Sequence, residues 1–275
     1  MRSVLAAALL VAILCLAVHP ARAESVDVAL IFAADVSRSV DDDEFKLQRQ
    51  GYATAVTNPR VLQAIAAGQH GAVAICFIEW SGPEEQQVVA DWTVVRDGET
   101  AAGFAAILLN APRSFVGRTS ISAALDFGRA YFAKAGVIAE RRVIDVSGDG
   151  TNNSGRPVLD AREEALAAGI VINGLAIINE HPNPGYFAHT QPPEGLPEYY
   201  RQNVVGGPGS FLLVVQDFSS FGEAITNKLV SEIAAAPHPW QAAAAAKSRS
   251  SPAPSGSLTP TLSTPRGGAA GVAGG

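Results

Sequence analysis

Three short polar segments of this 275-residue chain carry residue types that can bind a metal ion. The first is Asp35-Val36-Ser37-Arg38-Ser39, which follows an apolar run and precedes an acidic helix start. The second contains Thr119, just before a predicted helix, and the third contains Asp149, just after a second apolar run. Carboxylate and hydroxyl oxygens are hard donors, which Mg²⁺ and Ca²⁺ prefer. The candidate ligands of one divalent metal ion are therefore Asp35, Ser37, Ser39, Thr119 and Asp149.

Apolar strands and amphipathic helices alternate along the chain and must position these residues. The predicted strands are Val26–Ala34, Ala72–Trp80, Gln87–Trp92, Arg142–Val146, Ile170–Ile178 and Phe211–Val215. The predicted helices are Asp41–Thr57, Pro59–Ala67, Ala101–Leu109, Ser120–Lys134, Pro157–Ala168, a short one near Glu198–Asn203 within a long insertion, and a closing helix from Phe218 to Ile233. Continuous apolar strands joined by helices are typical of a mainly parallel sheet covered on both faces. Gln87–Trp92 follows a short Ser-Gly-Pro loop that suits a hairpin, so we expect an edge strand there. The predicted fold class is α/β, with a doubly wound six-stranded sheet and one antiparallel edge strand.

The order of these elements indicates where the polar segments meet. In open parallel sheets, binding sites form beyond the carboxyl ends of the strands. Asp35 and Asp149 each follow a strand, and Thr119 begins the helix that leads into the second of these strands. If the two strands are neighbours, the five oxygens converge on one crevice. A purely structural role for these residues stays open as an alternative, because Asp and Ser are also ordinary turn and helix-cap residues.

Composition indicates three regions in the chain. Arg2, the apolar stretch Val4–Val18 and Ala21-Arg22-Ala23 are typical of a secretory signal peptide, and the stretch is too short to span a membrane. We therefore expect a signal peptide over residues 1–23, one domain over 24–236 and a disordered, low-complexity tail over 237–275. The mature protein is expected to be secreted or periplasmic, with no integral membrane span.

Net charge and cysteine content limit which partners the protein can bind and whether it can form a disulfide. The chain has 20 basic and 26 acidic residues, and removing the five basic ones outside the predicted domain leaves 15 against 26. This acidic balance argues against nucleic acid or anionic lipid as partners and is compatible with binding a cation. Cys76 remains alone after signal cleavage, so no intramolecular disulfide forms, and we expect a buried thiol in mid-strand.

The three polar segments resemble the metal-ion-dependent adhesion site of von Willebrand factor A (vWA) domains. The resemblance covers about Val26 to Ile233 and implies a Rossmann-like sheet with an antiparallel edge strand. It also implies that Ser37, Ser39 and Thr119 contact the metal, with Asp35 and Asp149 nearby, often through water. The expected ion is Mg²⁺, with Mn²⁺ or Ca²⁺ as alternatives.

Other segments are similar to a secreted bacterial vWA subfamily of unknown function. They are Glu79-Trp80-Ser81-Gly82, Asp145 to Gly150, and the region from Tyr199-Tyr200 to Gly206-Gly207-Pro208-Gly209. Arg118 departs from the pattern, since many family members have Gly before the Thr. A long cation at this position would shield the site or pair with Asp149.

The preferred hypothesis is a non-catalytic, monomeric binding module whose metal accepts an Asp or Glu carboxylate from a partner protein. A lightly ligated metal ion retains water and has room for such a group. We expect Asn152 and Asn153 to form a polar turn rather than line the site, and Glu79 to be a solvated strand end.

An alternative is a hydrolase, either metal-assisted or subtilisin-like. Asp35, His70 and Ser120 occur in the chain order of subtilisin-like proteases. His70, however, precedes a predicted strand where such a protease would have a helix, and Ser120 lacks the expected glycine-rich turn. A purely structural protein is the remaining possibility.

Overall fold

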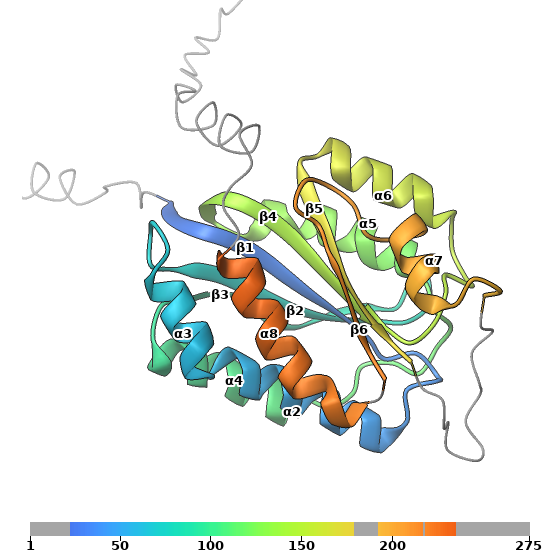
Figure 1. Cartoon of the computed structure of the whole chain (residues 1–275), viewed down its shortest axis with the longest axis horizontal. Helices are drawn as coiled ribbons and strands as arrows, with labels where there is room; N and C mark the ends of the chain where they lie inside the picture. The colour runs from blue at the N-terminus through green and yellow to red at the C-terminus, as the bar shows by residue number, and fades with distance from the viewer. Residues whose placement is uncertain (1–22, 179–191, 217, 235–275) are drawn as a thin grey trace, which may run out of the picture.

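The structure, a computed structural model, describes residues 23–178, 192–216 and 218–234 (Figure 1). The predicted signal peptide, up to residue 22, and the predicted tail lie outside the described residues, as does part of the predicted insertion. None of the helices in the described ranges has the length and apolar character that crossing a membrane requires.

Six strands form one sheet in the order β3-β2-β1-β4-β5-β6. Their bounds are Glu24–Asp35 (β1), Val73–Trp80 (β2), Gln86–Val95 (β3), Val137–Gly148 (β4), Ile170–Ile177 (β5) and Leu212–Val215 (β6). Strand β3 is antiparallel to β2 and all other neighbours are parallel, which confirms the predicted fold class. Asp35 pairs with Trp80, and Ala34 pairs with Ser147. The carboxyl ends of β1, β2 and β4 therefore lie side by side.

Helices cover both faces of this sheet (Figure 1). Their bounds are Asp42–Val56 (α2), Pro59–Ala66 (α3), Gly98–Asn110 (α4), Ile121–Tyr131 (α5), Val158–Ala167 (α6), Leu196–Asn203 (α7) and Phe221–Ala234 (α8), with 3₁₀ turns at Phe132–Lys134 (η1) and Phe218–Ser220 (η2). Helices α2, α3, α4 and α8 contribute to one hydrophobic core, and α5, α6 and α7 contribute to the other. A capping box opens α2, because Asp41 accepts from the Glu44 amide while Glu44 accepts from the Asp41 amide.

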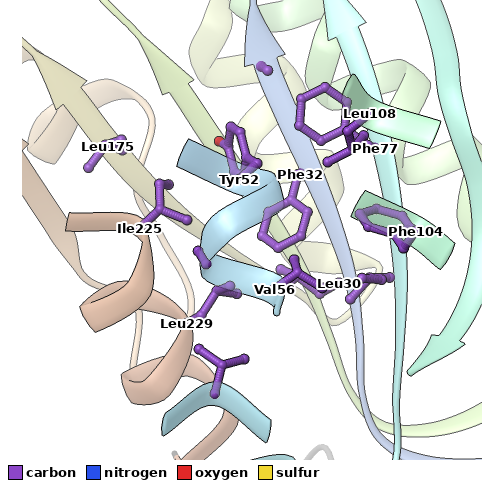
Figure 2. Close-up of a cluster of buried hydrophobic side chains, with 14 of the residues drawn as sticks. Leu30, Phe32, Tyr52, Val56, Phe77, Phe104, Leu108, Leu175, Ile225 and Leu229 are labelled. Atoms are coloured by element: carbon purple, nitrogen blue, oxygen red, sulfur yellow. The ribbon is translucent and has the colours of Figure 1, made fainter. Parts of the chain in front are cut away.

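Two buried cores explain why the strands read as continuous apolar runs. On one face the ring of Tyr52 lies 5.0 Å from the rings of both Phe32 and Phe77, within the cluster in Figure 2. On the other face Ile31, the neighbour of Phe32, packs in the second core. Cys76 is buried there as predicted, and burial raises the pKa of its thiol to about 12, so the thiol is unreactive.

Several predicted boundaries differ from the observed ones by one to five residues, and two of these differences have a clear physical reason. Strand β4 begins at Val137, five residues before the predicted Arg142, because β1 begins early and Glu24 pairs with Val137. The charged pair Glu140-Arg141 interrupts the apolar pattern in this part of β4. Pro157 caps α6 with ψ 131° instead of lying in its first turn, and the helix begins at Val158.

A buried ionic cluster fastens α8 to the sheet. Lys228 of α8 lies 2.8 Å from Asp145 of β4 and 2.6 Å from Glu232, and all three side chains are buried. Burial raises the pKa of Asp145 to about 7, against the opposing attraction of Lys228. Burial alone would lower the pKa of Lys228, but Asp145 and Glu232 outweigh burial and raise it.

Candidate metal centre

The segment after β1 folds into a tight turn that presents its polar side chains. Asp35, the last residue of β1, accepts a hydrogen bond from the Ser37 amide at 2.7 Å, as short Asp side chains do in turns. The amide of Val40 donates to the Ser37 carbonyl at 3.1 Å and closes the turn before α2 begins. This turn directs Asp35, Ser37 and Ser39 into the space beyond the sheet.

Hydroxyl contacts join this turn to the two other predicted segments. Ser37 Oγ lies 3.2 Å from Ser39 Oγ, and Thr119 Oγ1 donates to Ser37 Oγ at 3.2 Å. Ser39 Oγ donates to Asp149 Oδ1 at 3.1 Å. The five side chains range from 0% exposed at Asp35 to 8% at Ser39. The five candidate ligands predicted from the sequence therefore lie together in the structure.

The donors of this cluster fit a hard divalent cation. All are oxygens, and the hydroxyls of Ser37, Ser39 and Thr119 add donors without adding charge. The carboxylates of Asp35 and Asp149 are both buried, and a divalent ion would neutralise both. Throughout the described ranges, no group of three or more His, Cys, Asp or Glu side chains is arranged to hold a metal. This mixed carboxylate and hydroxyl cluster, termed the oxygen site below, is therefore the candidate metal centre.

Asn152 and Asn153 fix the loops of the oxygen site to each other. The Asn153 side chain accepts from the Thr119 amide at 3.1 Å, and its own amide donates to the Thr119 carbonyl at 2.9 Å. Asn152 Oδ1 accepts from the Ser122 amide at 3.0 Å. Arg118 donates to the Asn153 carbonyl at 2.7 Å. The expectation that these asparagines form only a polar turn is thus corrected, because they clamp the Thr119 and Asp149 loops together.

Arg113 holds the Ser37 turn from the other side, a role that the sequence did not indicate. Its Nη2 donates to the carbonyls of Val36 at 2.8 Å, Ser37 at 2.9 Å and Val40 at 2.8 Å. A rigid, permanently charged guanidinium suits three converging carbonyls. No local spacing could have indicated this contact, because Arg113 comes from the loop between α4 and α5.

The prediction that Glu79 is a solvated strand end was wrong. This residue is fully buried in β2, because Arg49 Nε donates to Glu79 Oε1 at 2.8 Å. Its second oxygen accepts from the Ser114 amide at 2.9 Å. Arg49 also donates to the Leu108 carbonyl at 2.5 Å. This buried pair therefore anchors the loop that leads to Thr119 and does not belong to the oxygen site itself.

Asp35, His70 and Ser120, the candidate residues of a subtilisin-like triad, do not lie together in the structure. His70 precedes β2 and contacts Glu140 at 3.4 Å, whereas Asp35 pairs with Trp80 at the far end of the same strand. The eight residues of β2 separate these ends by roughly 25 Å. Ser120 is buried and caps α5 by accepting from the Ala123 amide.

The sequence matches a known protein family over most of its length. A family model described as "Protein of unknown function (DUF1194)" matches residues 25–237 of the chain. No protein of curated function matches the sequence significantly.

Solved structures share the fold. Proximal thread matrix protein 1 (PTMP1) from the mussel byssus matches with a TM-score of 0.55 and 14% identity, over 78% of this chain and 49% of that chain. The same mussel protein with a zinc-occupied MIDAS motif gives 0.52 and 16%, over 78% and 49%. A von Willebrand factor type A structure from Catenulispora acidiphila gives 0.52 and 15%, over 76% and 43%. The chain spans about half the length of the PTMP1 chains. At these identities the likeness shows the fold, which is that of a vWA domain.

Proposed function

The chain belongs to the family described as proteins of unknown function (DUF1194), and for this member we propose a metal-dependent protein-binding module. The module holds one divalent cation, Mg²⁺ in the first instance, and captures an Asp or Glu carboxylate of a partner protein. The observation that carries the proposal is the convergence of five buried oxygens from three separate loops beyond the ends of β1 and β4.

The residues have distinct parts in holding the cation. Ser37, Ser39 and Thr119 supply neutral oxygens, and Asp35 and Asp149 supply the negative charge. A small hard cation with few protein ligands keeps several water molecules, and an external carboxylate can replace one of them. The bound cation thus supplies a positive charge for a partner's acid. The fold shared with the zinc-occupied PTMP1 structure supports this assignment.

The rim of the oxygen site also favours an anionic partner. Arg38 and Arg118 are both exposed, on two of the three loops that form the site. The Arg38 amide donates to the Gly117 carbonyl at 3.0 Å, so these two loops lie side by side. Exposed guanidinium groups recognise carboxylates through paired hydrogen bonds.

The proposal assigns no chemical step to the protein. Metal and rim residues bind the partner, and the loops are braced by Asn153, Arg113 and the Glu79–Arg49 pair. With the signal peptide expected at the N-terminus, the module acts outside the cytoplasm, in the envelope or the medium.

Metal-dependent thermal stability tests the first half of the proposal. Wild-type protein and Asp35→Asn are melted with Mg²⁺ and with EDTA. At a free Mg²⁺ concentration of about 100 times Kd, binding stabilises the wild type by about 2.7 kcal/mol. This corresponds to a rise in Tm of roughly 5–10 °C for a domain of this size. Asp35→Asn keeps an acceptor for the Ser37 amide but loses the charge, so its Tm should not respond to Mg²⁺.

The second half requires a capture experiment with the same proteins. Immobilised wild type should retain a partner from envelope extract in Mg²⁺, release it in EDTA, and lose it in Asp35→Asn. Asp160→Ala, which removes an exposed carboxylate on α6, is the matched control and should behave as wild type. A melting curve and a capture profile that EDTA leaves unchanged would overturn the proposal.

A further inference from the structure

A buried tyrosine of α7 approaches the oxygen site from the second core. Tyr200 is 0% exposed, yet among the described residues its hydroxyl has no hydrogen-bond partner. A buried polar group without a partner costs about 1–3 kcal/mol. Phenylalanine would fill nearly the same volume, so packing alone does not account for the hydroxyl. The position of this oxygen therefore requires another explanation.

Two glycines make room for the Tyr200 side chain beside the oxygen site. A Cβ added to Gly148 would lie 2.7 Å from Tyr200 Oη and 2.9 Å from Asp35 Oδ2. A Cβ added to Gly174 would lie 3.2 Å from Tyr200 Cδ1. The tyrosine hydroxyl and the Asp35 carboxylate therefore border the same narrow space at the end of β4.

The Tyr200 hydroxyl is a hydrogen-bond donor at neutral pH, as any phenol is. The neighbouring Tyr199 accepts from the Asn152 amide at 3.1 Å, in the loop that carries Asp149. Helix α7, from the connection between β5 and β6, thus borders the oxygen site at Tyr200 and bonds the loop that carries Asp149 at Tyr199.

From this placement we propose that Tyr200 is a positioning residue of the metal centre. When the cation is bound, its hydroxyl donates to the Asp35 carboxylate, directly or through one water molecule, and holds it in the orientation that the cation requires. A carboxylate oxygen accepts more than one hydrogen bond, so this one adds to the bond from the Ser37 amide. The inference rests on the proposed function, because it assigns a role toward the same cation.

Tyr200 would also influence which metal ion the oxygen site prefers. Groups that orient metal ligands typically contribute 10- to 100-fold to metal affinity. Mg²⁺ demands near-ideal octahedral geometry, whereas Ca²⁺ tolerates an irregular arrangement of ligands. A carboxylate held in place by Tyr200 therefore favours Mg²⁺ more than Ca²⁺.

Calorimetric titration of the full-length protein with Mg²⁺ and with Ca²⁺ tests the inference in Tyr200→Phe. We expect Mg²⁺ affinity to fall about 10- to 100-fold, with a smaller loss for Ca²⁺. The Tm of the metal-free variant should equal or exceed that of the wild type, because a buried hydroxyl without a partner is removed. A merely structural tyrosine would show the reverse, with a lower metal-free Tm and unchanged affinities.

Tyr131→Phe is the matched control. It removes a tyrosine hydroxyl that donates to Asp91 at 2.8 Å, on α5 beside β3, and should leave both affinities unchanged. If wild type binds Mg²⁺ and Tyr200→Phe binds it equally well, the role of Tyr200 is refuted while the proposed function stands. If wild type binds neither ion, the proposed function fails, and the role of Tyr200 fails with it.

Discussion

At the scale of single residues, the same side chains form the turn after β1 and supply oxygens to the oxygen site. Asp35, Ser37 and Ser39 are common turn residues, and their order after a strand made them candidate ligands. Glu79 was wrongly predicted to be solvated, and no role was predicted for Arg113. Their partners, Arg49 and the carbonyls around Ser37, come from other elements, so no local pattern contains the information.

The buried Glu79–Arg49 pair gives a prediction at this scale. In Glu79→Gln the Arg49 guanidinium, whose side chain is 4% exposed, loses its counter-charge in the interior. Breaking a buried pair by removing one partner typically costs 3–5 kcal/mol, so we expect the free energy of unfolding to fall by about that amount. Urea denaturation measures the loss.

Glu84→Gln is the control for this substitution, because Glu84 lies exposed in the hairpin turn after β2. It should change the free energy of unfolding by about 0.5 kcal/mol or less. A Glu79→Gln protein as stable as Glu84→Gln would show that the pair does not anchor the loop.

At the scale of elements, the sequence predicted the number and type of strands because most of them are largely apolar runs. It predicted the edge strand from the short loop between Trp80 and Gln87. It missed the first part of β4, where Glu140 and Arg141 interrupt the apolar pattern. This segment is a strand because it pairs with β1, and its local sequence pattern does not indicate that pairing.

The ionic cluster between α8 and β4 gives a prediction about pH. The pKa of Asp145 is about 7 in the folded protein, against about 4 in the unfolded chain. Between these values the folded state holds a proton that the unfolded chain has released, so this group makes stability fall as pH rises from about 4 to 7. In Asp145→Asn that contribution vanishes. Its stability relative to wild type should therefore rise by up to about 1.4 kcal/mol per pH unit between pH 5 and 7.

Urea denaturation of both proteins at several pH values measures this difference. Lys228 and Glu232 remain paired with each other at 2.6 Å when Asp145 is replaced, so one buried ion pair is kept in both proteins. Asp160→Asn, at an exposed position, should show a constant difference from wild type. A constant difference for Asp145→Asn as well would contradict a raised pKa at Asp145.

At the scale of the whole molecule, the proposed function gives an acidic domain a place that can bind anions. The sequence gives 26 acidic residues against 20 basic ones, and this imbalance was evident from composition alone. The placement of Arg38 and Arg118 at the rim was not, because it depends on how the loops after β1 and before α5 meet. A divalent cation between these arginines would let an otherwise acidic surface bind an acidic partner.

Anomalous diffraction from crystals soaked in Mn²⁺ would locate the bound ion itself. We expect one manganese peak at the oxygen site, about 2.0–2.4 Å from the hydroxyl oxygens of Ser37, Ser39 and Thr119. The peak should be absent from crystals of Asp149→Asn treated in the same way. Wild-type crystals with no peak at these oxygens, or with a peak only elsewhere on the protein, would contradict the account.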